Sequence, residues 1–230
     1  MSDIRVIETR DGSSSLLIPE MNETYHSTHG AITESEYVFL KMGLDHFRDK
    51  HPEQKEISIL EIGFGTGLNV WLTALAVENS GLKINFFSIE KYPLKPELIE
   101  KLNYKDKRKS DGARSLFAKV HEVEWEKQCE ISQAFSLTKI QTDIATFSPD
   151  RESYDLIYFD AFAPSKQPEM WSQEVLSKMH ELLKPNGVFV TYCAQGQFKR
   201  DLKAVGFDTE ELDGPPGKKE MTRGTKMATK

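Results

Sequence analysis

Three glycines stand within five residues of this sequence, in the segment Glu61-Ile-Gly-Phe-Gly-Thr-Gly-Leu-Asn. The apolar residues 57–62 predict a strand that leads into them, and residues 68–78 predict a helix that follows. Glycine is needed between such elements because the backbone turns sharply there and can lie against a ligand with no Cβ in between. This segment therefore predicts a strand, a ligand-binding loop and a helix in succession.

The rest of the chain continues the alternation of strand and helix patterns. Further strands are predicted at residues 83–90, 140–144, 154–159 and 188–192, with two short ones at 209–212 and 225–229. Helices are predicted at residues 172–183 and 197–205, and residues 94–136 are predicted to be mainly helical. Such alternation is typical of a Rossmann-like α/β fold with a doubly wound, mostly parallel sheet.

The first 50 residues carry a different pattern. Residues 5–18 predict a β-hairpin that turns at Asp11-Gly12, a dipeptide that tolerates the positive φ of a tight turn. Thr33 with Glu36 three residues later is typical of a helix N-terminus. The chain of 230 residues has the length of one α/β domain. We expect a hairpin and helix extension over residues 1–50 and a catalytic core over residues 51–230.

Composition excludes several classes of protein. No stretch approaches the roughly 20 apolar residues of a membrane span, and the residues after Met1 are polar and acidic, so neither a membrane anchor nor a signal peptide is expected. Cys129 and Cys193 lie far apart, so neither a disulfide framework nor a metal site is expected. A reducing cytoplasm is the expected location.

The charge distribution leaves two interpretations open. A net charge of -6 argues against a nucleic-acid partner. Two basic runs nevertheless occur, one made of Lys101, Lys105, Lys107, Arg108 and Lys109, the other of Lys218, Lys219, Arg223, Lys226 and Lys230. Such runs are more often solvated faces, but an RNA-facing rim is the alternative.

The spacing of the glycine segment indicates which ligand its loop binds. A dinucleotide fingerprint has the form G-x-G-x-x-G, whereas this segment reads E-x-G-x-G-x-G. The acid, Glu61, would repel a pyrophosphate but can attract the α-ammonium of an amino-acid ligand. The segment resembles motif I of class I S-adenosylmethionine-dependent methyltransferases. The resemblance implies cofactor contacts by Glu61, Gly63, Phe64, Gly65, Gly67 and Asn69; a turn that merely needs glycines is the alternative.

Two further acids stand where such folds contact this cofactor. Glu90 ends the next predicted strand, at the distance from the loop at which an acid binds ribose hydroxyls. Asp143 follows the third strand, where an acid accepts a hydrogen bond from the adenine amino group. A charged strand end and an ordinary loop aspartate are the alternatives.

Asp160 is the candidate catalytic residue. It begins Asp160-Ala-Phe-Ala-Pro, directly after the apolar strand 154–159, so it lies at the edge where open α/β sheets bind ligands. An amine acceptor must be unprotonated to attack a methyl group, and a carboxylate can take its proton. Ala161 and Phe162 are expected beside the cofactor, and Phe162, Pro164 and Trp171 against a planar substrate. Asp160 as a turn cap and the aromatic residues as core are the alternatives.

Four segments of the chain resemble the methyltransferase of the MnmC/MnmD family. They are Tyr25-His-Ser-Thr-His-Gly-Ala-Ile-Thr-Glu-Ser-Glu-Tyr-Val-Phe, the glycine segment, Asp160-Ala-Phe-Ala-Pro-Ser-Lys-Gln-Pro-Glu-Met-Trp and Gly214-Pro-Pro-Gly-Lys-Lys-Glu-Met. The resemblance implies N-methylation of the aminomethyl group of 5-aminomethyl-2-thiouridine at the tRNA wobble position. It also implies that Asp160 meets the acceptor amine and that Tyr25, Gly30 and Ser35 close over the cofactor. On this reading Lys218 and Lys219 bind the anticodon loop.

Bifunctional members of this family also carry a flavin-dependent oxidase. This chain ends near the close of the methyltransferase fold, so we expect no flavin, and an oxidase activity that is separate or not needed. Two other functions stay open: an enzyme on a small amine, either an N-methyltransferase or an aminopropyltransferase, and a non-catalytic binding module. Glu61 would be misplaced in an aminopropyltransferase, and the acids Glu61, Glu90 and Asp160 argue against a module without chemistry.

Overall fold

The structure, a computed structural model, describes residues 4–108 and 111–228, and it is built on an eight-stranded sheet. The strand order is β10-β11-β9-β8-β4-β5-β7-β6. The five central strands run parallel: β4 (Glu56–Ile62), β5 (Lys83–Ile89), β7 (Phe135–Ile140), β8 (Tyr154–Phe159) and β9 (Leu183–Thr191). The outer strands are antiparallel to their neighbours: β6 (Gln128–Ser132) at one edge, and β10 (Phe207–Asp213) with β11 (Glu220–Lys226) at the other end of the sheet.

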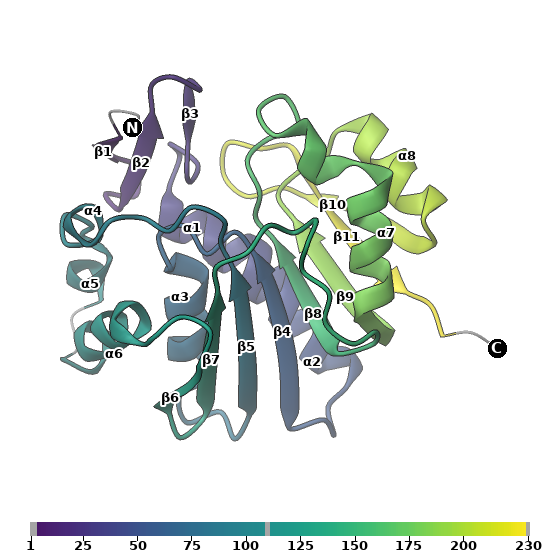
Figure 1. Ribbon diagram of the computed structural model, residues 1–230, viewed down its shortest axis with the longest axis horizontal. Coiled ribbons are helices and arrows are strands. Elements are labelled where there is room, and N and C mark those ends of the chain that lie inside the picture. The colour runs from purple at the N-terminus through teal and green to yellow at the C-terminus, as the bar shows by residue number, and fades with distance from the viewer. Residues whose placement is uncertain (1–3, 109–110, 229–230) are drawn as a thin grey trace.

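Helices cover both faces of this sheet (Figure 1). One face packs against α3 (Leu68–Val77), α6 (Asp111–Glu122) and a continuous helical stretch made of α1 (Ala31–Ser35), the π-helix η1 (Glu36–Asp45) and α2 (His46–Lys50). The other face packs against α7 (Gln173–Leu182) and α8 (Gly196–Ala204). Neighbouring β4 residues such as Ile59 and Leu60 enter opposite cores, because successive side chains of a strand point to opposite faces.

A three-stranded antiparallel sheet precedes the core, formed by β1 (Arg5–Glu8), β2 (Ser14–Ile18) and β3 (Glu23–Thr24). It lies at the end of the molecule toward which β4, β5 and β7 point (Figure 1). Leu16 of β2 joins a third apolar cluster with Trp71 of α3 and Tyr104 of α5 (Tyr104–Lys107). The remaining short helices are α4 (Pro96–Ile99) and the 3-10 turn η2 (Pro168–Trp171). The N-terminal strands are thus fixed beside the carboxyl ends of the parallel strands.

Several element boundaries differ from the sequence prediction. Residues 128–136, predicted as helix, form β6 and the start of β7, and the strand predicted at 140–144 ends at Ile140. The helix predicted at 172–183 ends at Leu182, and the segment Lys184-Pro-Asn-Gly that follows lies within β9, where the register with β8 is irregular. The C-terminal strands are longer than predicted and begin earlier. Lys109, Thr229 and Lys230, which belong to predicted basic runs or strands, lie outside the described residues.

The start of the first long helix also differs. Helix α1 begins at Ala31, and its N-cap is Gly30, three residues before the predicted N-cap Thr33. The Thr33 backbone N–H and hydroxyl donate to Asp11 Oδ2 at 3.0 and 2.9 Å. The capping carboxylate therefore comes from the β1–β2 turn and not from the helix's own sequence. Among the described residues, none of the helices combines the length and apolar character that a membrane crossing requires.

Candidate active site

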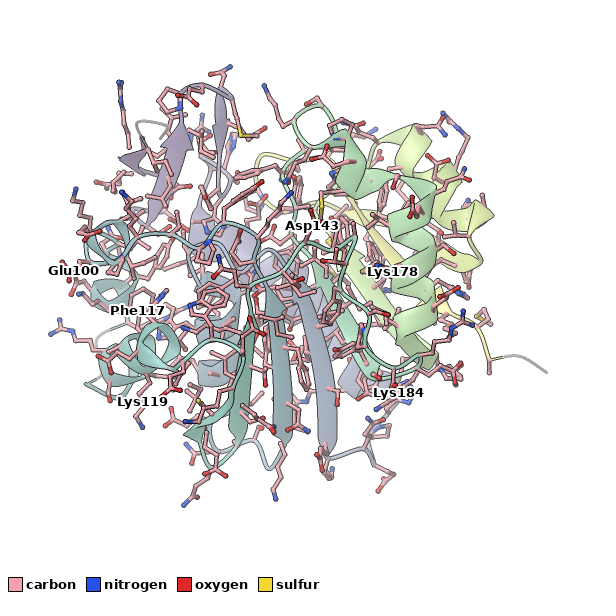
Figure 2. All side chains as sticks on the ribbon, in the orientation of Figure 1. Glu100, Phe117, Lys119, Asp143, Lys178 and Lys184 are labelled. Carbon is pink, nitrogen blue, oxygen red and sulfur yellow. The ribbon has the colours of Figure 1, made fainter. Side chains whose placement is uncertain are left out.

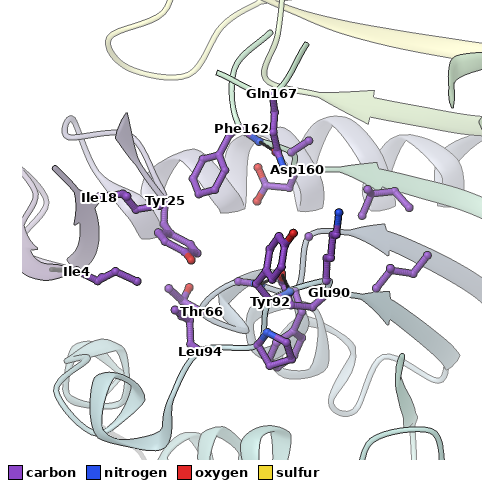
Figure 3. A pocket seen from close by; sticks show the side chains of 18 of the residues that line it. Ile4, Ile18, Tyr25, Thr66, Glu90, Tyr92, Leu94, Asp160, Phe162 and Gln167 are labelled. Carbon is purple, nitrogen blue, oxygen red and sulfur yellow. Dashed lines mark hydrogen bonds between the residues drawn. The ribbon is translucent and has the colours of Figure 1, made fainter. Parts of the chain in front are cut away.

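A cavity of about 670 Å³ opens at the carboxyl edge of the parallel strands. The β4–α3 loop forms one side of it, and the segments after β5, β7 and β8 and the N-terminal residues form the others (Figure 3). Ten predicted site residues line it: Tyr25, Gly63, Phe64, Gly65, Asn69, Glu90, Asp143, Asp160, Ala161 and Phe162. The structure therefore brings residues from separate segments of the sequence to one place.

The glycine loop fits tightly between its neighbours. The N–H groups of Gly63 and Phe64 both donate to the Ile89 carbonyl at 3.0 Å, which ties the loop to the end of β5. Gly63 has φ +96°, and a Cβ there would lie 2.7 Å from the Asp160 carbonyl oxygen. Only glycine satisfies both the dihedral angle and this close approach. Gly63 and Gly65 also line the cavity and present no side chain to it.

Glu90 connects the glycine loop to the segment that follows β5. Its Oε2 accepts a hydrogen bond from the Gly65 N–H at 3.0 Å, and its Oε1 accepts one from the Tyr92 N–H at 2.8 Å. Each carboxylate oxygen has a second lone pair. Glu90 can therefore hold the loop in place and still accept hydrogen bonds from a ligand in the cavity.

Asp143 lies in the loop after β7, on the cavity wall (Figure 2). Its Oδ1 accepts from the Ala145 N–H at 2.9 Å, and Lys91 Nζ lies 2.8 Å from its Oδ2. The hydrogen bond from Lys91 lowers the pKa of Asp143, so this acid stays ionised. Lys178 of α7 donates to the carbonyls of residues 144, 145 and 147, which fixes the loop that carries Asp143.

Asp160 faces the cavity from the end of β8. Its N–H donates to the Ile62 carbonyl at 3.0 Å, and its Oδ2 accepts from Asn69 Nδ2 at 2.9 Å. Burial raises the pKa of this carboxyl to about 7, with a further rise from Glu34, while the Asn69 hydrogen bond and Lys218 act in the opposite direction. A carboxyl group that titrates near neutral pH can both accept and release a proton under physiological conditions.

Aromatic side chains cover this part of the cavity. The rings of Tyr25 and Phe162 meet edge to face with centroids 5.1 Å apart (Figure 3). The Phe162 N–H donates to Gln167 Oε1 at 3.2 Å, and Trp171 Nε1 donates to the Phe162 carbonyl at 2.8 Å. Burial raises the pKa of the Tyr25 phenol, so its hydroxyl stays protonated.

The comparisons with known proteins agree with this geometry. A family profile described as S-adenosyl-L-methionine-dependent methyltransferase matches residues 111–227, just over half of the chain. The chain belongs to this family. The methyltransferase activity, the cofactor and the Rossmann-like class I fold predicted from the sequence are thereby confirmed.

Within this family, the chain is similar to relatives that share one particular name. Proteins named tRNA 5-methylaminomethyl-2-thiouridine biosynthesis bifunctional protein MnmC are similar over most of this chain. The one from Cupriavidus necator is 31% identical over 89% of this chain and 32% of its own length. The one from Pseudomonas savastanoi pv. phaseolicola is 30% identical over 91% and 33%. The chain thus spans about one third of the length of these relatives.

Solved structures give the same result. MnmC2 from Aquifex aeolicus superposes with a TM-score of 0.79 at 27% identity, over 100% of this chain and 72% of that one. The resemblance to the MnmC methyltransferase part is therefore confirmed. Spermidine synthase from Thermotoga maritima has a TM-score of 0.55 at 15% identity, over 97% of this chain and 68% of that one, which is a likeness of fold alone.

The residues of this methyltransferase's cavity fit S-adenosylmethionine. A volume of about 670 Å³ lies within the range of small-molecule sites. A Cβ at Gly65, whose φ is +48°, would lie 3.2 Å from the Tyr25 ring, so a bare backbone here leaves room beside the aromatic wall. Glu90 and the ionised Asp143 add acceptors for hydroxyl and amino groups. Among the described residues, no group of three or more His, Cys, Asp or Glu side chains is placed to hold a metal ion.

Eight predicted site residues lie outside the cavity lining: Gly30, Ser35, Glu61, Gly67, Pro164, Trp171, Lys218 and Lys219. Glu61 is fully buried; its Oε2 accepts from Ser88 Oγ of β5, and its Oε1 has no partner among the described residues. Burial raises the pKa of Glu61 well above its ordinary value. Its full burial, outside the lining of the cavity, is the main departure from the site predicted from the sequence.

The other seven residues outside the cavity lining serve as helix caps, lie in the core or lie near the surface. Gly30 and Gly67 are the N-caps of α1 and α3, Ser35 is buried in α1, and Trp171 is buried against Phe159 and Phe198. Pro164 is partly buried and stands next to the cavity-lining Ala161–Phe162 segment. The C-terminal basic run does not form one surface, because three of its members, Lys218, Arg223 and Lys226, pair with Glu34, Glu210 and Glu152. Lys219, with 92% of its side chain exposed, is its solvent-facing member among the described residues.

Sequence reasoning missed several residues that line the cavity. Lys91 and Tyr92 directly follow Glu90, and Tyr92 is 70% exposed at the rim. Their position immediately after a predicted strand was a usable signal. Gln167 and Met170 belong to the Asp160–Trp171 segment but carry no distinctive chemistry in sequence. His26 reaches the cavity through a hydrogen bond of 2.7 Å to Thr66 of the glycine loop, a contact that no local pattern indicates.

Proposed function

We propose that this enzyme transfers a methyl group from S-adenosylmethionine to the aminomethyl nitrogen of 5-aminomethyl-2-thiouridine at the wobble position of tRNA. The observation that carries the proposal is the Asp160 carboxyl group, which faces the cavity beside the glycine loop and titrates near neutral pH. The names of the MnmC relatives support the tRNA substrate over a small amine.

Different residues of the cavity would bind different parts of the cofactor. Glu90 would hold the ribose hydroxyls, Asp143 the adenine amino group, and the bare backbone of Gly63 and Gly65 the amino-acid end. When bound, S-adenosylmethionine supplies an electrophilic methyl group on a sulfonium centre. Tyr25 and Phe162 cover the cavity beside the loop and exclude water from it.

Asp160 prepares the acceptor. A primary amine arrives mostly as ammonium at neutral pH, and it has no lone pair for attack until a proton leaves. The ionised form of Asp160 accepts that proton, and Asn69 Nδ2 fixes the orientation of the carboxylate. Because the pKa of Asp160 is about 7, a large fraction of the enzyme carries the carboxylate at neutral pH and the group still binds a proton well.

The substrate base enters from the solvent side of this cavity. A wobble nucleoside is unstacked in an anticodon loop, and splayed bases stack on aromatic side chains. Tyr92 at the rim and Phe162 beside Asp160 supply such surfaces. Lys219 has a largely exposed side chain and directly follows Lys218 in the sequence. We propose that it contacts the phosphate backbone of the tRNA. With a tRNA substrate, we expect the enzyme to act in the cytoplasm.

The test is mass spectrometry of nucleosides from hypomodified tRNA incubated with enzyme and isotopically labelled S-adenosylmethionine. We expect label in the methylaminomethyl nucleoside with the wild-type enzyme and a large loss with Asp160→Asn. Asp150→Asn is the matched control, because Asp150 is exposed and outside the cavity. Label found on putrescine or spermidine but not on tRNA would replace this proposal with the small-amine enzyme.

A further inference from the structure

A group of charged and aromatic side chains lies beside the Asp160 segment, outside the cavity lining. Lys218, from the loop between β10 and β11, places Nζ 2.5 Å from Glu34 Oε1. The same ammonium lies 3.7 Å from the centroid of the Tyr192 ring. Glu34 is 7% exposed and belongs to α1, whereas Tyr192 follows β9. Three segments that are distant in sequence therefore meet at one cation.

The contacts of this group extend to both walls of the site. Glu34 Oε2 accepts a hydrogen bond of 2.8 Å from the Ser27 N–H, two residues from the cavity-lining Tyr25. The Tyr192 hydroxyl donates to the Ala161 carbonyl at 2.8 Å, directly after Asp160. Lys218 thus joins the segment that covers the cavity to the segment that carries the proton acceptor.

The loop that carries Lys218 is itself held against the N-terminal segment. A Cβ at Gly217 would overlap the His29 ring, so the two residues are in direct contact. The Tyr37 hydroxyl donates to the Asp213 carbonyl at 3.1 Å. The ammonium position is therefore fixed by the fold and is not that of a mobile surface lysine.

This arrangement also acts on Asp160 electrostatically. Glu34 raises the pKa of Asp160 and Lys218 lowers it, in addition to the larger effect of burial. Within the described part of the chain, Glu61 of β4, Tyr104 of α5 and Tyr192 also interact with Asp160. Lys218 is the cation of this set. A buried ion pair adds little net stability by itself, so the position of this pair beside the Asp160 carboxyl points to a role other than stability.

We propose that Lys218 and Glu34 are positioning residues for methyl transfer: they hold the Asp160–Phe162 segment through Tyr192 and balance the charge beside the Asp160 carboxyl group. This inference rests on the proposed role of Asp160 as proton acceptor. Lys218 acts through Asp160 and Tyr192 and does not itself contact the reacting atoms. Its neighbour Lys219, by contrast, has 92% of its side chain exposed, in an ion pair of 3.5 Å with Glu220, and is accessible to tRNA.

The first test follows the titration of Asp160 without substrate or cofactor. Carboxyl carbon NMR of the protein labelled with ¹³C-aspartate, with Asp160→Asn identifying the resonance, gives the titration midpoint. We expect Lys218→Met to move the midpoint up and Glu34→Gln to move it down, each by about half to one pH unit, because a nearby charge shifts a pKa in this way. Lys218→Arg keeps the charge and should restore the wild-type midpoint.

The second test measures methyl transfer to hypomodified tRNA as a function of pH. Lys218→Met should lower kcat and move the acidic limb of its pH profile upward, whereas Glu34→Gln should move the limb downward. Lys219→Met is the matched control: it removes the same charge one residue away and should raise KM for tRNA without moving the limb. A lysine with a purely structural role would lower activity equally at all pH values.

The outcomes separate the two proposals. Unmoved midpoints in both Lys218→Met and Glu34→Gln overturn the positioning role, whatever happens to activity. If Lys218→Met fails to fold, Glu34→Gln carries the test alone, and a midpoint that does not fall overturns it. Opposite shifts of the midpoint together with no methylation of tRNA by the wild-type enzyme support the electrostatic coupling and overturn the proposed substrate.

Discussion

Replacing Asp160 with asparagine should make the protein more stable at alkaline pH while it removes activity. In the folded protein the pKa of Asp160 rises from the ordinary 3.8 to about 7, chiefly because the carboxyl is buried. Well below pH 3.8 the group is protonated in both the folded and the unfolded state, so it has no effect on the free energy of unfolding. Between pH 4 and 7 the unfolded chain loses the proton more readily, and the wild-type protein is progressively destabilised.

The magnitude follows from the size of this difference. Each pKa unit corresponds to about 1.4 kcal/mol, so a change from 3.8 to about 7 sets a ceiling of about 4 kcal/mol. One side of the carboxyl faces the cavity, where solvent screens part of the effect, and we expect about 1–3 kcal/mol. The introduced asparagine carries no charge at any of these pH values and keeps an oxygen that can accept from Asn69. The variant should therefore gain stability over the wild type as pH rises from 4 to 7, and hold that gain above 7.

Urea unfolding of the two proteins at pH values from 4 to 9 measures this difference directly. Asp150→Asn, at an exposed position, should show no such pH-dependent gain. The same Asp160→Asn protein should lose about 10²- to 10⁴-fold in kcat, the usual contribution of a positioned general base. A stability difference that stays flat from pH 4 to 9, or an Asp160→Asn protein less stable than wild type at pH 8, would refute the reasoning.

Further expectations concern the cofactor and the tRNA. Calorimetry should show S-adenosylmethionine binding weakened by roughly 1.5–3 kcal/mol in Glu90→Ala, the range for hydrogen bonds to a charged group; an unchanged affinity would remove Glu90 from the site. Gly63→Ala should destabilise the protein by about 1–3 kcal/mol more than Gly81→Ala, because both glycines have positive φ but only Gly63 has a neighbouring carbonyl within contact of a Cβ, and equal losses by thermal unfolding would contradict this. S-adenosylmethionine and not NAD should raise the melting temperature, and a rise with NAD alone would overturn the cofactor assignment. Binding of tRNA should weaken steeply with salt and less steeply in Lys219→Glu, whereas identical salt slopes would exclude Lys219 from the interface.

The fold prediction succeeded where the signal was local. Buried parallel strands are short apolar runs, and the run at residues 154–159 is buried throughout, so its assignment needed no knowledge of its neighbours. It failed at the β6–β7 hairpin, whose connection through Gln133 and Ala134 lacks the glycine or asparagine that marks a tight turn. It also misplaced the start of α1, because the capping carboxylate of Asp11 comes from another element.

The site prediction divides in the same way. Ten of the predicted residues meet in one cavity, most of them because they stand at the carboxyl ends of parallel strands, and the topology brings all such ends to one edge. Glu61 is the residue before the last in β4, and its side chain is fully buried. The next residue, Ile62, lines the cavity, because successive side chains of a strand point to opposite faces.

The sequence by itself determined the order of most strands and helices, the glycine loop and the acids that follow β5, β7 and β8, because these depend on neighbours a few residues away. Only the tertiary structure decided what Lys218 does. In the sequence it is one of several C-terminal cations, indistinguishable from Lys219. In the fold it pairs with Glu34, 184 residues earlier, while Lys219 stays in solvent. The physical reason is that charge interactions act through space, and the distance between two side chains is set by the packing of the elements that carry them.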